Sequence, residues 1–333
     1  MSARWSARRW GWLGTVGALG LALGAMSCQP SSGDDKEEPD QYTAAPAGGE
    51  KPVAFDGKRA MGYLEAVCKI GPRISGTAGM TKQQQLIEKH FKKLGAKPVY
   101  QKFTATQKSL GRPVEMKNIV VSYYPERTRR VIVCSHYDTR PIADKEPNEK
   151  RWRDPFVSAN DGGSGVAFLM EMAHHMKGLK TKVGVDFVFF DGEEYIFDPD
   201  RDEYFFGSKH FADQYKKARN APKYTGAILL DMIAGKGAEF PREQNSIAYA
   251  SGLVKEVWGI AREQKCDAFK HKESDYSVLD DHIPLNQAKI PAIDIIDFDY
   301  PHWHKLTDVP KNCSAKPMEQ VAKVVSVWMQ RTK

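Results

Sequence analysis

The stretch Val185-Asp-Phe-Val-Phe-Phe190, followed directly by Asp191-Gly-Glu193-Glu194, decides how this chain of 333 residues is interpreted. A short run of aromatic and β-branched residues is typical of a strand, and a run that is apolar nearly throughout indicates a strand covered on both faces. Such strands lie in parallel sheets between layers of helices. The two glutamates therefore fall at the carboxyl end of a central strand, where open α/β sheets bind their ligands.

Strand and helix patterns alternate from about residue 54 to the end of the chain, without a repeat or a break. Strands are predicted at Val99–Thr104, Asn118–Tyr123, Arg130–Ser135, Gly226–Leu230 and Ala292–Ile296. Helices are predicted at Lys58–Lys69, Thr81–Leu94, Gly163–Met176, Ser208–Ala218, Ser246–Gln264 and Lys316–Gln330. We therefore predict one α/β domain over residues 54–333, with a largely parallel, twisted central sheet flanked by helices.

Four further polar positions stand beside apolar runs: His136, Asp161, Asp231 and His304. Each has an ordinary structural interpretation when it is taken alone. Asp161, for example, precedes a glycine-rich helix start and is placed to cap that helix. Together with the glutamate pair, however, they bring imidazole and carboxylate groups to the ends of several strands. These are the ligands that zinc prefers, so the pattern predicts a zinc-dependent enzyme.

The glutamate pair can divide two chemical tasks between its members. Successive side chains at a strand end point to opposite sides. One of Glu193 and Glu194 can therefore bind a metal while the other faces substrate as an acid or base. By the same geometry, His136 and Asp138 lie on one side of their segment. Asp138 is thus predicted to orient the metal-binding side chains without binding the metal itself.

The first 27 residues have the pattern of a secretory signal, in which a basic start precedes an apolar stretch. The segment Leu23-Gly-Ala-Met-Ser-Cys28 resembles a bacterial lipoprotein cleavage box with Cys28 as the acylated residue, although Ala25 stands where leucine is usual. Residues 28–53 contain almost nothing apolar and are predicted to be a flexible tether. We expect an exported periplasmic or cell-envelope lipoprotein, anchored to the membrane by lipid. A cleaved soluble form and an uncleaved anchor are the alternatives.

The charge pattern does not favour nucleic acid as a partner. The net charge is +7, but Arg4, Arg8 and Arg9 belong to the predicted signal, and without them the charge is +4. No basic cluster is interleaved with aromatic residues, which is the pattern that nucleic-acid binding favours. Among the cysteines beyond residue 28, Cys134 lies inside a strand pattern, so we expect it to be a buried free thiol.

The order His, Asp, Glu-Glu, Asp, His resembles the M28-type zinc aminopeptidase superfamily and, within it, the animal-type glutaminyl cyclases. The blocks that carry the resemblance are Ser135-His-Tyr-Asp-Thr139, Phe189-Phe-Asp-Gly-Glu-Glu194, Gly207-Ser-Lys-His210, Leu230-Asp-Met-Ile233, Asp280-Asp-His-Ile-Pro284 and Trp303-His304. The long loop from Tyr195 to Phe206 favours the cyclases over ordinary aminopeptidases. Two positions depart from the animal pattern, because Pro199 stands for a pocket tryptophan and Asp294 for a histidine.

The resemblance implies a glutaminyl-peptide cyclotransferase that converts the N-terminal glutamine of peptides and proteins to pyroglutamate. It implies one zinc ion on Asp161, Glu194 and His304, with Glu193 as the proton shuttle. It also implies that Asp231 and Asp280 form a supporting acid network and that Trp303 lines the glutamine pocket. His302, His174 and His175 are expected to lie outside the site.

Two alternatives remain open at this point. The first is an aminopeptidase with two zinc ions, for which His136 and Asp231 complete the second metal site. The second is a non-enzymatic, receptor-like relative that has lost its metal, although every ligand position is occupied by a suitable residue.

Overall fold

The computed structural model describes residues 49–333. The predicted signal segment, Cys28 and most of the predicted tether lie outside the described residues. Within residues 49–333, none of the helices combines the length and the apolar character that crossing a membrane requires.

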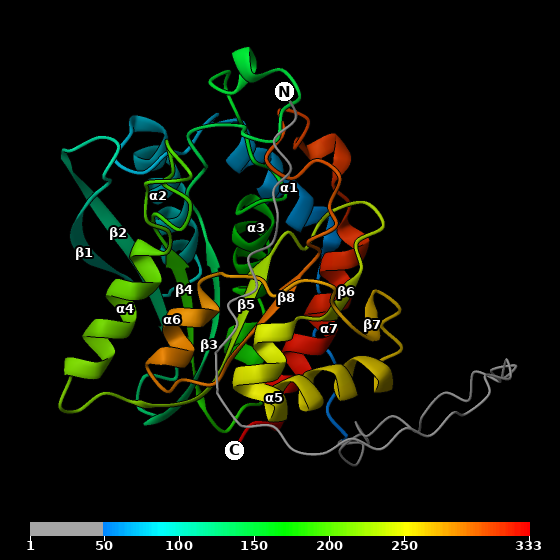
Figure 1. Ribbon diagram of the computed structural model, residues 1–333. Coiled ribbons are helices and arrows are strands. Elements are labelled where there is room, and N and C mark those ends of the chain that lie inside the picture. Colours follow the sequence, from blue (N-terminus) through cyan, green and yellow to red (C-terminus); the bar gives the residue numbers. More distant parts are fainter. Residues whose placement is uncertain (1–48) are drawn as a thin grey trace, which may run out of the picture. The chain divides into compact units, whose positions relative to one another are not determined.

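A six-stranded mixed sheet carries the site, with the strand order β1-β2-β4-β3-β5-β8 (Figure 1). Its strands are β1 (Pro98–Thr106), β2 (Pro113–Tyr123), β3 (Arg129–His136), β4 (Gly184–Phe190), β5 (Lys223–Asp231) and β8 (Ala292–Ile296). Strands β4, β3, β5 and β8 are parallel, whereas β1 and β2 form an antiparallel hairpin that joins β4. The predicted largely parallel sheet is confirmed, and the antiparallel edge adds to it.

Strand residues alternate between two cores, as the period of two in a strand requires. In β3, Val131 and Val133 face the larger core, while Ile132 and Cys134 face the smaller one on the other side. The side chain of Cys134 is fully buried and its thiol is free, as predicted. Because both faces of the central strands are covered, their sequences read as continuous apolar runs.

Seven helices are described around the sheet (Figure 1). They are α1 (Gly57–Cys68), α2 (Ala78–Lys93), α3 (Gly163–Met172), α4 (Phe206–Lys217), α5 (Gln244–Glu263), α6 (His282–Gln287) and α7 (Ala315–Arg331). Helices α1, α2, α3, α5 and α7 contribute to the larger core, and α4 and α6 to the smaller one. Two short strands, β6 (Phe240–Arg242) and β7 (Phe269–Glu273), pair separately from the main sheet.

Several segments differ from the sequence prediction, and the short strands β6 and β7 are among those that were not predicted. Helix α3 ends at Met172 instead of Met176, because the chain passes through a turn into a short 3-10 helix at Met176–Gly178. Helix α6 was not predicted, since its six residues are too few to show a helical period. The other predicted helices and strands are present, with ends that differ by a few residues.

An ion pair is buried within the sheet at the start of the parallel strands. The guanidinium of Arg130 donates to both oxygens of Asp186, at 2.9 and 2.6 Å, and the Tyr224 hydroxyl donates to the same carboxylate at 2.7 Å. Arg130 is 4% exposed and Asp186 is 2% exposed. This pair accounts for the single charged residue in the otherwise apolar strand β4.

Replacement of Asp186 by alanine should strongly destabilise the fold, because it leaves the Arg130 charge buried without its partner. We expect a loss of about 3–5 kcal/mol in the free energy of unfolding, measured by urea titration. The matched control is Asp213→Ala, which removes an exposed pair with Lys216 at 2.7 Å. The control should cost less than about 1 kcal/mol. Equal losses of unfolding free energy in the two variants would contradict the prediction that the buried pair stabilises the fold more than the exposed pair does.

Candidate metal centre

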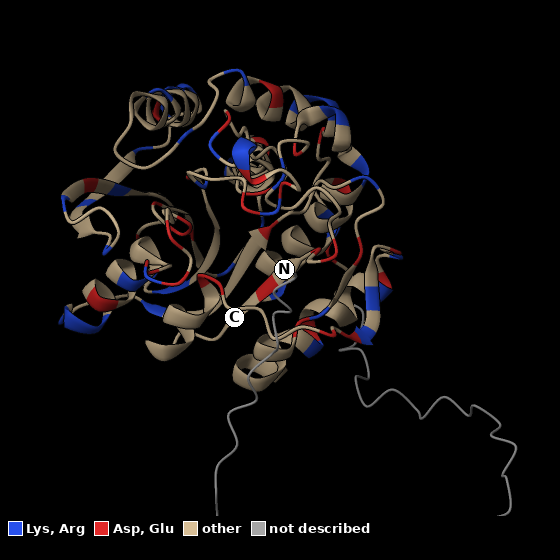
Figure 2. Ribbon diagram, turned by 45° about the horizontal axis from the view of Figure 1, so that its top comes forward, with Lys and Arg blue, Asp and Glu red and all other residues tan. Residues whose placement is uncertain are grey.

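Five polar segments meet at one edge of the sheet, where the parallel strands end. His136 and Asp231 are the last residues of β3 and β5, and Glu193 and Glu194 follow β4. Asp161 precedes α3, and His304 lies in the loop after β8. Figure 2, in which the top of Figure 1 comes forward, shows acidic positions among the loops in the middle of the view. The structure therefore brings together all five ligand positions of the sequence prediction.

Two groups of possible metal ligands share Asp161. In the first, Nε2 of His304 lies 3.1 Å from Oε2 of Glu194 and 3.5 Å from Oδ2 of Asp161. In the second, Nε2 of His136 lies 3.1 Å from Oδ1 of Asp161 and 3.3 Å from Oδ1 of Asp231. Within each group, the ligand atoms all lie within 4.8 Å of one another.

The chemistry of these residues fits a divalent metal ion. Oδ2 of Asp161, Oδ1 of Asp231 and both ring nitrogens of His136 are buried without a hydrogen bond within residues 49–333. Buried polar atoms without partners are costly, and a bound cation would give them one. Burial, and then the charge of Asp161, raise the pKa of Glu194 to about 7. A bound cation would reduce the repulsion between the carboxylates of Asp161 and Glu194. Mixed nitrogen and carboxylate ligands suit zinc.

Asp161 does not cap helix α3, so the structural interpretation of this residue is wrong. Gly162 is the capping residue, with φ of 74°, and no side chain caps the helix. A Cβ atom at Gly162 would lie only 2.7 Å from Cε1 of His136. Glycine therefore allows both the left-handed turn and the close approach of His136. The turn leaves the Asp161 carboxylate free to face the other ligands.

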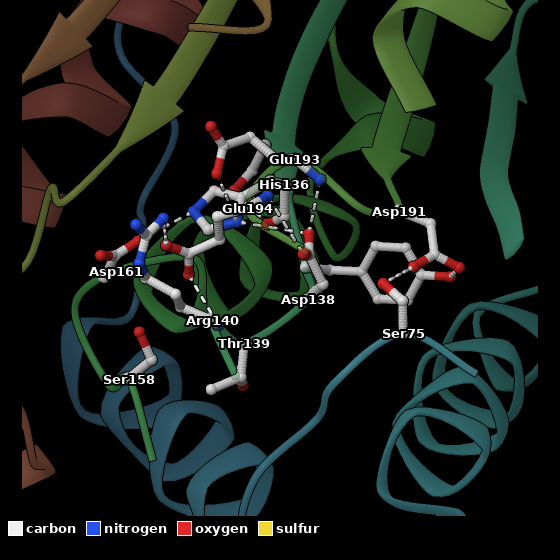
Figure 3. Close-up of polar contacts among 12 residues, drawn as sticks. Ser75, His136, Asp138, Thr139, Arg140, Ser158, Asp161, Asp191, Glu193 and Glu194 are labelled. Atoms are coloured by element: carbon white, nitrogen blue, oxygen red, sulfur yellow. Dashed lines mark hydrogen bonds and ion pairs between the residues drawn. The ribbon is translucent and has the colours of Figure 1, made fainter. Parts of the chain in front are cut away.

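The carboxylate of Asp138 fixes the turn that carries the glutamate pair. Its Oδ1 accepts the backbone N–H of Glu193 at 3.0 Å, and its Oδ2 accepts that of Glu194 at 3.2 Å (Figure 3). The predicted orienting role of Asp138 thus acts mainly on the backbone of its neighbours. Nδ1 of His136 is more distant, at 3.6 Å from Oδ1 of Asp138.

The two glutamates have different surroundings. Glu194 belongs to the first ligand group, whereas Glu193 is grouped only with His136 and Glu194, and its Oε2 lies 3.8 Å from Nδ1 of His136. Burial raises the pKa of Glu193 well above its usual value, because it outweighs the opposing charge of His136 and acts with the charge of Asp280. A carboxyl group with a raised pKa suits the uptake and return of a proton.

Three residues that the sequence analysis missed hold His304 and Glu194. Oδ1 of Asp144 lies 2.9 Å from Nδ1 of His304, on the side of the ring opposite the ligand group. Arg140 donates to both oxygens of Asp144, at 3.0 and 2.9 Å, and its backbone N–H donates to Oε1 of Glu194 at 2.9 Å. The backbone N–H of Lys145 donates to the carbonyl of His304 at 3.2 Å.

The segment from Arg140 to Lys145 holds His304 in an uncommon backbone conformation. His304 has φ of 52°, a value that non-glycine residues rarely adopt and that persists where the surroundings enforce it. Burial and Arg140 lower the pKa of its imidazole, but the carboxylates of Asp144 and Glu194 outweigh them and raise it to about 9. A carboxylate behind a histidine ligand fixes the ring orientation and strengthens the ligand.

A fourth missed residue, Asp308, supports the Asp161 segment. Its carboxylate accepts the backbone N–H groups of Asn160 at 2.9 Å and Asp161 at 3.2 Å, and the Tyr300 hydroxyl at 2.9 Å. Asp308 comes shortly after His304 in the sequence. It therefore links the loops that carry two of the possible ligands.

The remaining predicted residues lie around this centre. Asp280 is buried, and burial followed by the charges of Asp231 and Asp281 raises its pKa well above the usual value. The ring of Trp303 lies 4.3 Å from that of His304. His302 turns instead toward Thr307 and lies outside the ligand groups, as do His174 and His175.

Comparison with known proteins identifies relatives over most of the chain. Residues 118–329 match peptidase family M28. The mouse glutaminyl-peptide cyclotransferase-like protein is 23% identical over 239 residues, which span 65% of this chain and 61% of that protein. The crystal structure of Fimbriiglobus ruber glutaminyl cyclase is 50% identical, with a TM-score of 0.84 over 87% of this chain and 100% of that chain. A Zn-dependent exopeptidase from Parabacteroides distasonis is 30% identical, with a TM-score of 0.76 over 84% of this chain and 99% of that chain.

Asp144→Asn should weaken zinc binding by about 10- to 100-fold, because the amide keeps the side-chain size but removes the charge behind His304. The measurement is competition for zinc between the metal-free protein and a chelator. Asp154→Asn is the control, since Asp154 lies in the same segment but is exposed and pairs with Arg151. Wild-type zinc affinity in Asp144→Asn would contradict a supporting role for this carboxylate.

Proposed function

This chain belongs to peptidase family M28, and from that premise we propose that it is a glutaminyl cyclase. It would convert the N-terminal glutamine of a peptide or protein to pyroglutamate and release ammonia. The observation that carries the proposal is the 50% identity to Fimbriiglobus ruber glutaminyl cyclase along the whole of that chain. The complete set of buried ligand positions, with Glu193 beside them, supports it.

Asp161, Glu194 and His304 would hold one zinc ion. When bound, zinc would act as a Lewis acid on the γ-carbonyl of the substrate glutamine. Asp144 and Asp308 would keep two of these ligands in place, through the ring of His304 and the backbone of Asp161. Trp303, whose ring contacts that of His304, would form a wall of the glutamine pocket.

Glu193 would move the proton that the cyclisation requires. The α-amine nitrogen of the substrate attacks its own γ-carbonyl carbon, the bond to the amide nitrogen breaks, and ammonia leaves. Glu193 takes a proton from the attacking amine and returns it to the leaving nitrogen. Because the attacking amine and the γ-carbonyl belong to the same substrate molecule, the enzyme does not have to bind a second reactant to bring them together.

Asp231 and Asp280 would hold Glu193 and the reacting atoms through a network of buried acids. The charge of Asp280 helps to raise the pKa of Glu193, and the charge of Asp231 helps to raise the pKa of Asp280. Asp294, at the position where animal cyclases have a histidine, is a further buried carboxyl group, and burial and the charge of Asp280 raise its pKa.

One observation favours a second candidate, an aminopeptidase with two zinc ions. His136 and Asp231 converge on Asp161 and could hold a second metal beside the first. Glu193 would then activate a water molecule for hydrolysis. The similarity to the Parabacteroides distasonis exopeptidase is compatible with this reading. A receptor-like protein without metal is a weaker candidate, because all ligand positions are retained.

We further propose that residues 1–27 direct export and that Cys28 carries a lipid anchor. The acid-rich, almost apolar-free sequence of residues 28–53 is suited to a spacer between an anchor and the enzyme.

Substrate choice tests the proposed function directly. The purified protein should cyclise a glutaminyl dipeptide and release ammonia, and it should not release the arylamine from a leucyl arylamide. Product formation is followed by mass spectrometry, because cyclisation and hydrolysis give different masses. Release from the leucyl substrate without cyclisation would favour the aminopeptidase, and absence of bound metal would favour the receptor-like protein.

Glu193→Gln should abolish most of the turnover while zinc occupancy is kept. The amide has the size of the carboxylate but cannot accept the amine proton, so kcat should fall by about two orders of magnitude or more. Ammonia release and zinc content are measured on the same samples. Glu203→Gln, which changes an exposed glutamate in the neighbouring loop, should leave both unchanged. Loss of zinc from Glu193→Gln would mean that Glu193 and Glu194 have exchanged roles.

A further inference from the structure

A group of basic side chains lies at the edge of the sheet where the parallel strands begin, opposite the metal centre. Arg127 and Arg129 stand at the start of β3, Lys180 and Lys182 precede β4, and Lys223 begins β5. The eight residues of β3 separate this edge from the metal centre by about 23 Å of extended chain. We call these five basic residues the basic edge.

Contacts between neighbouring strands bring the basic edge together. Arg129 and Lys223 are Cα partners across β3 and β5. The guanidinium of Arg127 donates to the carbonyl of Thr181, which lies between the two lysines before β4, at 2.7 Å. Arg129 and the three lysines are exposed, and Arg127 is half-buried. Like charges directly opposite one another destabilise a sheet, so the Arg129–Lys223 pair has a cost that a bound anion would reduce.

The acidic side chains near the basic edge already have basic partners. Glu126 lies 3.5 Å from Nε of Arg127, and Oε2 of Glu50 lies 3.2 Å from Nε of Arg331. Within residues 49–333, no Asp or Glu side chain forms an ion pair with Arg129 or with the lysines of the basic edge. The basic edge therefore presents an excess of positive charge to its surroundings.

The described chain enters the domain at this same edge. The side chain of Gln330 donates to the carbonyl of Lys51 at 3.0 Å, beside the end of α7. The guanidinium of Arg129 donates to the backbone oxygen of Lys333 at 3.1 and 2.6 Å, so the end of α7 lies beside the start of β3. Figure 1 shows the C-terminus below the sheet, away from the loops of the metal centre. A lipid on Cys28, as proposed above, would thus be connected to the domain at the basic edge.

We propose that the basic edge binds the anionic headgroups of a phospholipid membrane, so that the metal centre faces away from the membrane and toward soluble peptides and proteins. Lysine and arginine side chains close to an anionic membrane are attracted to its surface charge. The carboxylates of the metal centre lie at the opposite edge, and this separation of charge favours one orientation of the molecule. The inference goes beyond the proposed reaction and does not depend on it.

The test measures sedimentation of the full chain with lipid vesicles, using Cys28→Ser to remove the proposed lipid anchor. One set of vesicles contains phosphatidylcholine alone, and the other contains phosphatidylcholine mixed with the anionic lipid phosphatidylglycerol. Binding to the anionic vesicles should be tighter by about tenfold or more and should weaken when salt is added, because salt screens exposed charges. Replacement of Lys180, Lys182 and Lys223 together by glutamine should remove this preference.

The matched control replaces Lys69, Lys82 and Lys311 by glutamine. These lysines are also exposed, but they follow α1, lie in α2 and precede α7, outside the basic edge. The control removes the same amount of positive charge and should keep the preference for anionic vesicles. Equal losses of binding in the two triple variants would overturn the proposal, because net charge alone would then explain the binding. Equal binding of the unsubstituted edge to the two kinds of vesicle would overturn it as well.

Hydrogen exchange tests the orientation without any substitution in the basic edge. With anionic vesicles, exchange should slow at residues 125–129 and 180–183, and it should stay unchanged in the loop of residues 145–155 beside the metal centre. Mass spectrometry of the peptides from these segments provides the measurement. Slower exchange in residues 145–155, with no change at the basic edge, would show that the metal centre faces the membrane and would overturn the proposal.

Discussion

Repulsion among buried carboxylates is the constraint on which the arrangement of this protein depends. Asp161, Glu194, Asp231 and Asp280 are buried at one edge of the sheet and Glu193 is partly buried beside them, so that loss of solvent makes each negative charge costly. Two imidazole rings lie among these groups and offset part of the repulsion. The proposed zinc ion would offset much of the remainder. The catalytic chemistry and the stability of this edge therefore have the same electrostatic origin.

A second set of aspartates converts this unfavourable cluster into a defined geometry. Asp138, Asp144 and Asp308 each accept hydrogen bonds from, or lie against, a segment that carries a possible ligand. Each comes from a different loop from the segment that it supports. Strand ends set the approximate position of each ligand, and these carboxylates set its orientation. Position and orientation are thus determined by different parts of the sequence.

This division explains how much could be predicted from the sequence. Strand ends follow from apolar runs, so His136, Glu193, Glu194 and Asp231 could be placed at one edge before the structure was known. Asp144, Arg140 and Asp308 lie in irregular loops, where no period relates a residue to its partner. Nothing local connects Asp144 with His304, which lies far along the chain. The direction of β1 and β2 was likewise undetermined, because an apolar run indicates a strand but not its pairing.

The spread of the ligand positions along the chain also bears on how the protein is assembled. Asp161 lies near the middle of the sequence, whereas His304 follows the last strand and precedes only the final helix. A nascent or truncated chain that lacks the last strand and its following loop has no His304 and therefore lacks the first ligand group, although every residue of the second group is present. Such long-range closure delays formation of the first ligand group until the sheet is complete. Metal binding by this group would then mark the end of folding.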